Sequence, residues 1–426
     1  MPAPGTALPR TGIQAPARPA HRDGNVLRWL AAYTASVIGD SVYFLALGWA
    51  ANQVGGPAEA GLVMAVGAVP RALLMLGGGV IADRVGPRRV VIGSDAIRCL
   101  VVLAVAAALA LAAPGLWLLV TMALVFGVVD ALFMPAVGAL PPRITSPDQL
   151  VRVQGLRSLT VRAGTMAGPP LGGMAMAVHG PAAAFGVAGG LFAVSLALLL
   201  AVRIAPLPPD DTAGAAARPT PWQDLLDGLR HIRRHPLIGP LVLSGAISEL
   251  GCAGPLNIGL VLLASDRGWG ASGLGWIVSA FGAGAAVSAL LLTVVGRLPR
   301  AGAVQICTLV VGSAALGSLG LAPSLPLAVG LAALSGLVCG VCGGLSFALV
   351  QAATAPAYLG RVGSVMSLTG LGIAPLSYPL FGAAVTAWGA APVFLASGAL
   401  SALGAAVGLV SPTVRRAELP RQKSVR

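Results

Sequence analysis

Long apolar stretches alternate with short polar loops along almost the whole chain, and twelve of these stretches carry few or no charges. Because an α-helix rises ~1.5 Å per residue, about 20 apolar residues cross a hydrocarbon layer ~30 Å thick. The pattern therefore predicts an all-α membrane protein with twelve transmembrane helices. The expected spans are residues 26–51, 60–82, 90–112, 115–139, 151–178, 181–203, 237–263, 271–296, 302–322, 326–353, 360–385 and 390–411.

A longer polar segment between the sixth and seventh spans divides them into two groups of six. It begins as a flexible linker, APLPPDDTAGAAARPTP, and continues as WQDLLDGLRHIRRHP, whose leucines share one helical face. We expect this second part to form a helix on the cytoplasmic membrane surface. Its histidines, His231 and His235, have no evident third ligand, so no metal site is predicted.

The predicted domains are a disordered cytoplasmic tail (1–24), an N-terminal six-helix bundle (25–204), the cytoplasmic linker with its amphipathic helix (205–236), a C-terminal six-helix bundle (237–411) and a basic cytoplasmic tail (412–426).

The two groups of spans contain an internal repeat. LVRVQGLRSLT (150–160) aligns with LGRVGSVMSLT (359–369), and the match continues without a gap to Gly180 and Gly389. Spans five and six thus resemble spans eleven and twelve in the same membrane orientation. Such a parallel duplication is typical of transporters, whose substrate site lies between the two halves near the membrane midplane.

Basic residues gather in the loops on one side of the predicted membrane. The loops of the other side hold a single basic residue, Arg267. By the positive-inside rule, both termini are predicted to be cytoplasmic. The net charge of +13 is thereby explained by orientation, and no nucleic-acid partner is expected. The basic residues assigned to the cytoplasm are Arg10, Arg18, Arg22, Arg84, Arg88, Arg89, Arg143, Arg230, Arg233, Arg234, Arg297, Arg300, Arg361, Arg415, Arg416 and Lys423.

The loop between spans two and three, GVIADRVGPRRV, concentrates charge between two apolar segments. It resembles a loop motif of the major facilitator superfamily, with Pro87 inserted before the final arginine pair. The resemblance implies two six-helix halves and a cytoplasmic latch, in which Asp83 faces the start of span eleven and the arginines contact acidic groups and lipid headgroups. Asp95 and Arg98 on span three are expected to complete this charge cluster. The latch residues are Gly79, Asp83, Arg84, Gly86, Arg88, Arg89, Asp95 and Arg98.

A glycine-rich motif lies in span five, in the segment GTMAGPPLGG. It resembles the antiporter motif of drug exporters in the same superfamily. Other short segments, among them GDSVYFLALGW, VPRALLMLGGGVIADR and FMPAVGALPPRI, resemble the branch of enterobactin and macrolide exporters. Glycines four apart allow close helix contact, and a proline kinks the helix. The motif residues are Gly164, Gly168, Pro169, Gly172 and Gly173. The arginine motif of many drug:proton antiporters is absent from span four, where Asp130 stands instead.

Three acidic residues lie deep in the predicted spans: Asp40, Asp130 and Glu249. Ionisable groups inside a membrane are costly and usually face a cavity or a partner. The resemblance places spans one, four and seven around the central cavity, where a carboxyl group could load and release a proton. The alternative is a structural role, in hydrogen bonds or in ion pairs with Arg71 or Arg162.

We hypothesise a secondary active transporter that exports a small, largely apolar molecule such as a drug, natural product or siderophore, by proton antiport with alternating access. The proton gradient supplies the energy and no cofactor is expected. A nutrient importer is the alternative, and a lipid-modifying membrane enzyme is discounted because the four histidines lack evident catalytic partners. We expect a monomer, surrounded by membrane lipid, in a bacterial inner membrane. The candidate substrate-cavity residues are Trp49, Trp276, Phe281, Met366 and Tyr378.

Overall fold

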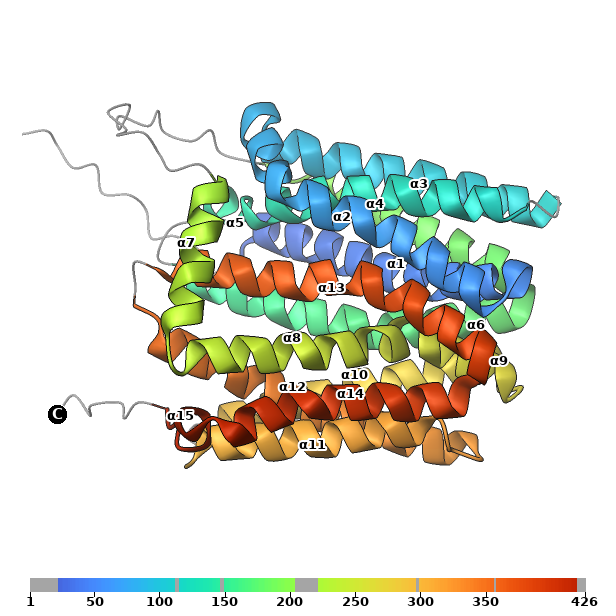
Figure 1. Ribbon diagram of the computed structural model, residues 1–426. Coiled ribbons are helices and arrows are strands. Elements are labelled where there is room, and N and C mark those ends of the chain that lie inside the picture. Colours follow the sequence, from blue (N-terminus) through green and yellow to red (C-terminus); the bar gives the residue numbers. More distant parts are fainter. Residues whose placement is uncertain are drawn as a thin grey trace, which may run out of the picture.

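The structure, a computed structural model, describes residues 22–111, 115–145, 149–203, 221–295, 299–355 and 358–419. Long helices lie side by side and one short helix, α7, crosses one end of the bundle (Figure 1). The N-terminal helices are α1 (Gly24–Gly55), α2 (Pro57–Val85), α3 (Pro87–Leu111), α4 (Leu116–Gly138), the short α5 (Pro141–Ile144) and α6 (Leu150–Leu200). They are followed by α7 (Pro221–Arg234), α8 (Ile238–Gly254), a π-helical turn (Pro255–Gly259), α9 (Leu260–Asp266), α10 (Gly270–Val295), α11 (Ala301–Leu319), α12 (Leu325–Ala353), α13 (Leu359–Trp388), α14 (Ala390–Val410) and α15 (Pro412–Arg415).

The predicted spans agree with these helices. Ten segments of the described chain are long and apolar enough to cross a membrane, and they account for eleven of the twelve predicted spans; the span 360–385 corresponds to the helix α13, which is not among the ten. One of them, in α6, includes two predicted spans, because its 51 residues turn at His179 and Gly180, where the backbone is not helical. The predicted seventh span consists of α8, the π-helical turn and α9. The all-α membrane fold is therefore confirmed.

The internal repeat is visible in the backbone. Gly180 and Gly389, 209 positions apart, both adopt a left-handed extended conformation, with φ of 69° and 80°. Each glycine lies between two consecutive helical segments that run in opposite directions, and a residue with a side chain would be strained at such a φ. The residues that directly precede α6 and α13, Gln149 and Tyr358, also have similar backbone angles, with φ of −97° and −109°. The two segments fold alike.

The two halves meet along α2 with α13 and along α6 with α10. Glycines allow these contacts: a Cβ at Gly61 would lie 2.6 Å from the Tyr378 carbonyl oxygen, and one at Gly173 would lie 2.7 Å from the Ala271 carbonyl oxygen. Both contacts lie toward the end of the bundle where α9 meets α10, which we call the α9 end. The opposite end, crossed by α7, is the α7 end. The halves are thus tightly packed toward the α9 end.

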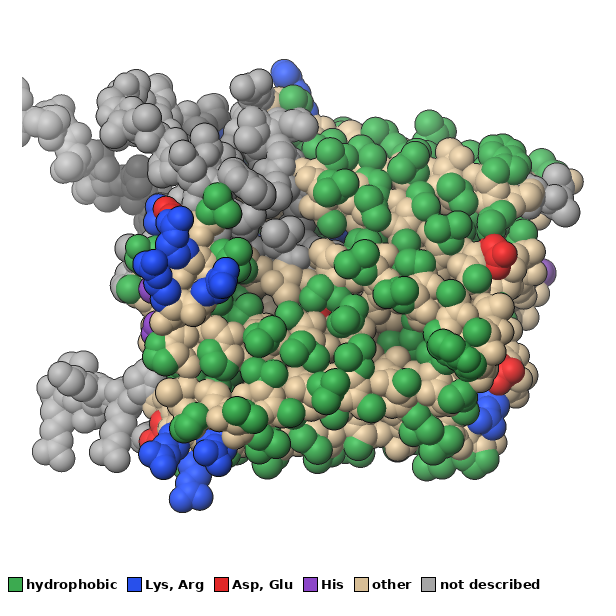
Figure 2. Space-filling model, in the orientation of Figure 1, with side chains coloured by type: hydrophobic (Ala, Val, Ile, Leu, Met, Phe, Trp, Pro, Cys, Tyr) green, Lys and Arg blue, Asp and Glu red, His purple; other side chains and the backbone are tan. Residues whose placement is uncertain are grey.

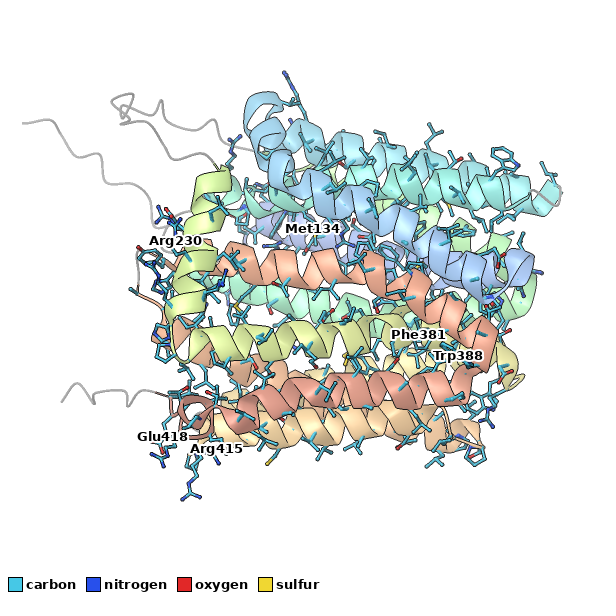
Figure 3. The ribbon with its side chains drawn as sticks, in the orientation of Figure 1. Met134, Arg230, Phe381, Trp388, Arg415 and Glu418 are labelled. Atoms are coloured by element: carbon cyan, nitrogen blue, oxygen red, sulfur yellow. The ribbon has the colours of Figure 1, made fainter. Side chains whose placement is uncertain are left out.

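The described surface separates apolar and charged side chains as the sequence predicts. Figure 2 shows apolar side chains over the length of the bundle, and most of the coloured arginine side chains on this face lie at the α7 end. Arg230 and Arg415 both lie there in Figure 3. Arg267 stands near the α9 end, where it donates a hydrogen bond to the Gly320 carbonyl oxygen at 3.0 Å. The charge asymmetry of the loops is therefore present in the folded chain.

Candidate functional site

A buried cluster of charged side chains lies inside the N-terminal half. Four helices contribute to it: α1 supplies Asp40, α2 supplies Arg71, α3 supplies Asp95 and Arg98, and α4 supplies Asp130. Asp95 and Arg98 are three positions apart, so they share one face of α3, and that face is buried against the neighbouring helices. We call these five residues the ionic cluster.

Arg98 is the centre of the ionic cluster. Its side chain is only 1% exposed and forms ion pairs with Asp40 at 3.8 Å, with Asp95 at 3.5 Å and with Asp130. The guanidinium also lies 4.0 Å from the centroid of the Phe133 ring, a favourable cation–π position. A charge buried this deeply is tolerated only when partners offset its desolvation. Arg98 therefore holds three helices of the half together.

Asp95 and Asp130 are well compensated. Asp95 accepts a hydrogen bond from the Ser195 hydroxyl at 2.5 Å and another from the Ser36 hydroxyl at 3.4 Å. Asp130 pairs with Arg98 through one oxygen and lies 3.6 Å from Arg71 through the other. Each of these carboxylates thus has two or more polar partners inside the protein.

Asp40 is the least compensated acid of the ionic cluster. Its side chain is 24% exposed, it lies at the longest of the ion-pair distances to Arg98, and its Oδ1 is buried without a hydrogen-bond partner. With all groups ionised, three carboxylates face two guanidiniums, so the cluster carries one net negative charge. A single proton would make it neutral.

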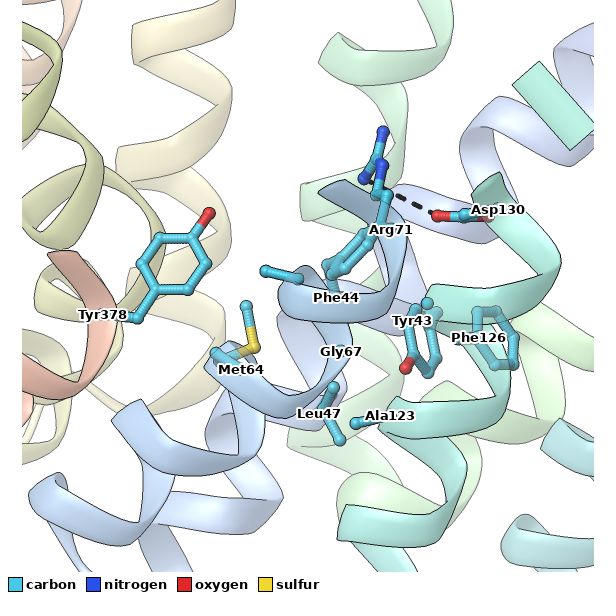
Figure 4. Close-up of a pocket in the computed structure, with 12 residues that line it drawn as sticks. Tyr43, Phe44, Leu47, Met64, Gly67, Arg71, Ala123, Phe126, Asp130 and Tyr378 are labelled. Carbon is cyan, nitrogen blue, oxygen red and sulfur yellow. Dashed lines mark ion pairs between the residues drawn. The ribbon is translucent and has the colours of Figure 1, made fainter. Parts of the chain in front are cut away.

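A small cavity of about 70 Å³ adjoins the ionic cluster (Figure 4). Arg71 and Asp130 form its charged side, and Tyr378 reaches it from the C-terminal half. Aromatic rings dominate the remaining wall, where Tyr43 stacks on Phe126 with a centroid distance of 3.7 Å. The lining residues are Tyr43, Phe44, Leu47, Met64, Gly67, Ala68, Arg71, Ala123, Phe126, Gly127, Asp130 and Tyr378.

Of the five cavity residues predicted from the sequence, Tyr378 alone lines this cavity. Trp49 and Phe281 pack into or against the apolar core, and Met366 packs in a separate apolar cluster at the α7 end. Trp276 is 62% exposed and takes no part in the cavity wall. The substrate contacts expected of these four residues stay a prediction, because large apolar residues chosen span by span do not indicate which face of each helix turns toward a cavity.

The sequence did contain a signal for the aromatic wall. Tyr43 and Phe44 follow Asp40 by three and four residues, so all three lie on one side of α1. Arg71 was expected to be an ion-pair partner, and its contact with Asp130 agrees with that expectation. Arg162, the other expected partner, is exposed and forms no ion pair with a described residue.

Glu249 lies on α8 in the C-terminal half, away from any such cluster. It is half-buried, and no ion pair or hydrogen bond joins it to another described residue. It stands 209 positions after Asp40, so the repeat makes the two acids equivalent. The same register puts Cys307 at the equivalent of Arg98 and Cys339 at that of Asp130. The C-terminal half thus has an acid equivalent to Asp40, but it has no charged residues at the positions equivalent to Arg98 and Asp130.

The glycine motif of α6 lies between the two halves. Gly164, Gly168 and Gly172 face α1, where added Cβ atoms would meet Val37, Ser41 and Leu45 respectively. Gly173 faces α10 of the other half, and Pro169 contributes a carbonyl oxygen 2.9 Å from a Cβ placed at Gly275. The motif therefore forms a seam of close helix contacts, one face toward α1 and one toward α10.

The loop motif is described in part. Side chains of residues 75–84, including Asp83 and Arg84 and the position of Gly79, lie outside the described residues. Gly86 turns the chain with a φ of 92°, and Arg88 donates a hydrogen bond to the Leu200 carbonyl oxygen at 3.3 Å; Arg89 is exposed. Asp95 and Arg98, which we expected to complete the latch, form ion pairs within the ionic cluster with Asp40 and Asp130. The latch itself stays a prediction, since the side chains of Asp83 and Arg84 lie outside the described residues.

The two histidines of the linker make separate contacts. His231 stacks on Tyr358 with a centroid distance of 4.3 Å, and His235 Nδ1 accepts hydrogen bonds from the amides of Leu237 and Ile238 at 3.3 and 3.2 Å. Partial burial, and then the neighbouring His231, lower the pKa of His235 below its usual 6.5. Within the described ranges, no three His, Cys, Asp or Glu side chains are grouped to hold a metal ion.

Comparison with known proteins finds similar sequences and similar folds among membrane transporters. The enterobactin exporter EntS of Shigella boydii serotype 18 is 28% identical over 285 residues, which are 67% of each chain, and EntS of Escherichia coli O139:H28 gives the same values. A bacterial homolog of the human lysosomal transporter Spinster, in an inward-facing and occupied conformation, superposes with a TM-score of 0.73 at 14% identity, covering 91% of this chain and 96% of that one. The nucleoside transporter NupG superposes with a TM-score of 0.70 at 14% identity, covering 91% and 99%. The family profile of the Major Facilitator Superfamily matches residues 29–251, just over half of the chain, and the chain belongs to that family of membrane transporters.

Proposed function

We propose that this transporter exports a small, largely apolar organic molecule in exchange for protons. The observation that carries the proposal is the ionic cluster, which has one uncompensated negative charge and borders an aromatic cavity between the halves. A cluster that a single proton makes neutral can couple proton movement to conformational change. The similarity to EntS supports export as the direction and a siderophore-like molecule as the first substrate to test.

Asp40 is the proton carrier in this mechanism. Neutralising it removes the net negative charge while Asp95 and Asp130 keep Arg98 and Arg71 compensated. Asp130 is less suited, because protonating it would weaken the pairing of two guanidiniums at once. Glu249, the equivalent acid of the other half, is a second candidate, and its lack of a charged partner makes its neutral form easy to hold in a membrane.

The packing of the halves supports alternating access. The arginine-rich α7 end faces the cytoplasm under the positive-inside rule, so the tight contacts of Gly61 and Gly173 close the exterior side. The cavity of about 70 Å³ is far smaller than the roughly 300–1,000 Å³ of drug-sized sites. Substrate therefore enters after the α7 end opens, when Tyr378 moves relative to Tyr43 and Phe126. The apolar walls favour a ring-containing substrate.

The test uses inverted membrane vesicles that contain the chain and a pH-sensitive dye. Interior acidification is imposed, and then enterobactin, ethidium or erythromycin is added to the outside. We expect at least one of these compounds to accumulate inside while protons leave, and we expect nigericin to abolish both signals. Accumulation that persists after nigericin, or accumulation with no proton release, would contradict proton exchange.

A further inference from the structure

The linker helix α7 presents two different faces at the α7 end. One face packs against the C-terminal half: Ile232 is buried, and Gly228 lies so close to α13 that a Cβ would stand 2.9 Å from the Arg361 carbonyl oxygen. The other face leaves Leu226 and Leu229 exposed beside three arginines, Arg230, Arg233 and Arg234. The helix is held in place by the first face, and the second has no partner among the described residues.

A groove of about 850 Å³ begins at this second face and continues between α8 and α14. Its walls are aliphatic, with Leu243 and Val242 on α8 and Val407 and Val410 on α14. Leu229 and Arg233 of α7 form its end. A second hollow of about 490 Å³, lined by Leu226, Leu229, Arg230, Arg233 and Arg234, shares both of these residues. The two hollows adjoin at Leu229 and Arg233, so the apolar walls and the group of guanidiniums lie next to each other.

The guanidiniums are not equally available. Arg230 forms an ion pair with Asp227 at 2.9 Å. Arg233 and Arg234 are exposed and form no ion pair with any described acid. Both belong to the last turn of α7, which crosses the ends of the spanning helices in Figure 1. We expect this end of the bundle to lie at the level of the lipid headgroups. Two unpaired arginines at the end of an apolar groove have the charge and shape to bind an amphiphilic anion.

We propose that the groove between α7, α8 and α14 is a binding site for an anionic glycerophospholipid. An acyl chain lies along Leu243, Val407 and Val410, and the phosphate is bound by Arg233 and Arg234, whose planar donor groups suit phosphate oxygens. The bound lipid contacts the linker helix and two spanning helices at once. It therefore fixes α7 to the C-terminal half, and this effect adds to the packing of Gly228 on α13.

The test is native mass spectrometry of the purified full chain with phosphatidylglycerol or phosphatidylcholine. We expect saturable binding of phosphatidylglycerol at one site and weaker binding of phosphatidylcholine. Because each arginine near a membrane surface contributes about five-fold to anionic lipid binding, Arg233→Gln with Arg234→Gln should weaken it about 30-fold. The control pair, Arg28→Gln with Arg152→Gln, removes the same charge from exposed arginines of the other half and should leave binding unchanged.

A second variant tests the apolar part of the site. Ala406 lines the groove and is exposed, so Ala406→Trp fills the groove without disturbing the core. It should displace phosphatidylglycerol although all arginines remain, and millimolar inorganic phosphate should not compete with the lipid. Equal binding of both lipids would show that the groove holds acyl chains without regard to headgroup charge, and an equal loss in both arginine pairs would show general charge attraction. Either result would overturn the proposal. These measurements do not involve transport, so their outcome is independent of the exported substrate.

Discussion

The Asp40 carboxylate lies 3.8 Å from Arg98 Nη1 through one oxygen, while its other oxygen, Oδ1, is buried without a hydrogen-bond partner. Asp95 approaches the same Nη1 at 3.5 Å, and Asp130 pairs with Nη2. Asp40 is thus the member of the ionic cluster whose charge can be removed with the smallest loss of contacts. This relationship separates an acid that can change its charge from acids that hold the helices together.

Asp40→Asn should abolish accumulation of substrate driven by a pH gradient and leave downhill exchange largely intact. The amide keeps the shape of the side chain and removes the exchangeable charge. The measurement is substrate uptake into inverted vesicles with and without an imposed pH gradient. Asp40→Glu is the matched control and should keep part of the gradient-driven activity.

The other two acids complete this experiment. Asp130→Asn should lower stability as well as transport, because it removes a partner of both Arg98 and Arg71. Glu249→Gln has no ion pair to lose among the described residues and should leave stability unchanged. If all three single variants and the triple variant still accumulate substrate against its gradient, the coupling mechanism is wrong.

Arg98→Gln should destabilise the protein severely, by about 3–5 kcal/mol, because removing one partner leaves buried carboxylates without their counter-charge. Thermal unfolding of the detergent-purified chain measures the effect. Adding Asp130→Asn to Arg98→Gln should recover part of the lost stability, since it removes one of the buried carboxylate charges that Arg98 no longer compensates. A double variant no more stable than Arg98→Gln would mean that packing against Phe133, and not charge, explains the role of Arg98.

Gly173→Ala should separate the halves at the α9 end. The added Cβ would lie 2.7 Å from the Ala271 carbonyl oxygen, so α6 and α10 must move apart, at a cost of about 1–3 kcal/mol. Labelling of a cysteine introduced at Met64 by a membrane-impermeant maleimide, applied from that side, should become faster. Gly190→Ala, on the same helix with no atom within 4 Å of its Cβ, should label at the wild-type rate.

Gly228→Val should release α7 from α13, because even a Cβ at this position would lie 2.9 Å from the Arg361 carbonyl oxygen. The stacking of His231 on Tyr358 would be lost with it. Hydrogen–deuterium exchange over residues 226–235 should become at least several-fold faster. Gly245→Val, where a Cβ on α8 meets no atom within 4 Å, controls for the added valine and should leave exchange in α7 unchanged.

The linker junction should lose stability in acid. Nδ1 of His235 can accept hydrogen bonds from Leu237 and Ile238 only when it is unprotonated, and burial lowers the pKa of His235 below 6.5. Since the unfolded chain binds this proton more readily, the stabilisation is complete above pH 6.5 and declines as the pH falls through the folded value. The melting temperature of the wild type should therefore fall more than that of His235→Asn between neutral and mildly acidic pH.

The sequence predicted the spans and the repeat well because neither depends on how the helices pack against one another. A run of apolar residues is sufficient to indicate a membrane helix, and the turn at Gly180 and Gly389 depends on a φ that glycine adopts without strain. The ionic cluster is different, because its partners come from four helices. Asp95 and Arg98 were recognised as neighbours on one helix, but their pairing with Asp40 and Asp130 is decided by how α1, α3 and α4 pack.

The equivalence of Asp40 and Glu249 was within reach of the sequence. The two residues are separated by the same 209 positions that relate Gly180 to Gly389, and extending the alignment to the first span of each half would have found it. The exposure of Trp276 was not within reach, because hydrophobicity does not distinguish a face turned to lipid from one turned to the protein interior.

The restriction of the ionic cluster to one half has a consequence for biogenesis. A charged residue at the centre of an isolated helix costs about 2.5–3.5 kcal/mol during insertion by the translocon. Helix α3 carries Asp95 and Arg98 and α4 carries Asp130, so these helices enter lipid at lower cost once their charges have met. Helices α10, α11 and α12 of the second half carry no charge at the equivalent positions. We therefore expect the helices of the first half to assemble as a group during synthesis, and most helices of the second half to enter the bilayer one at a time.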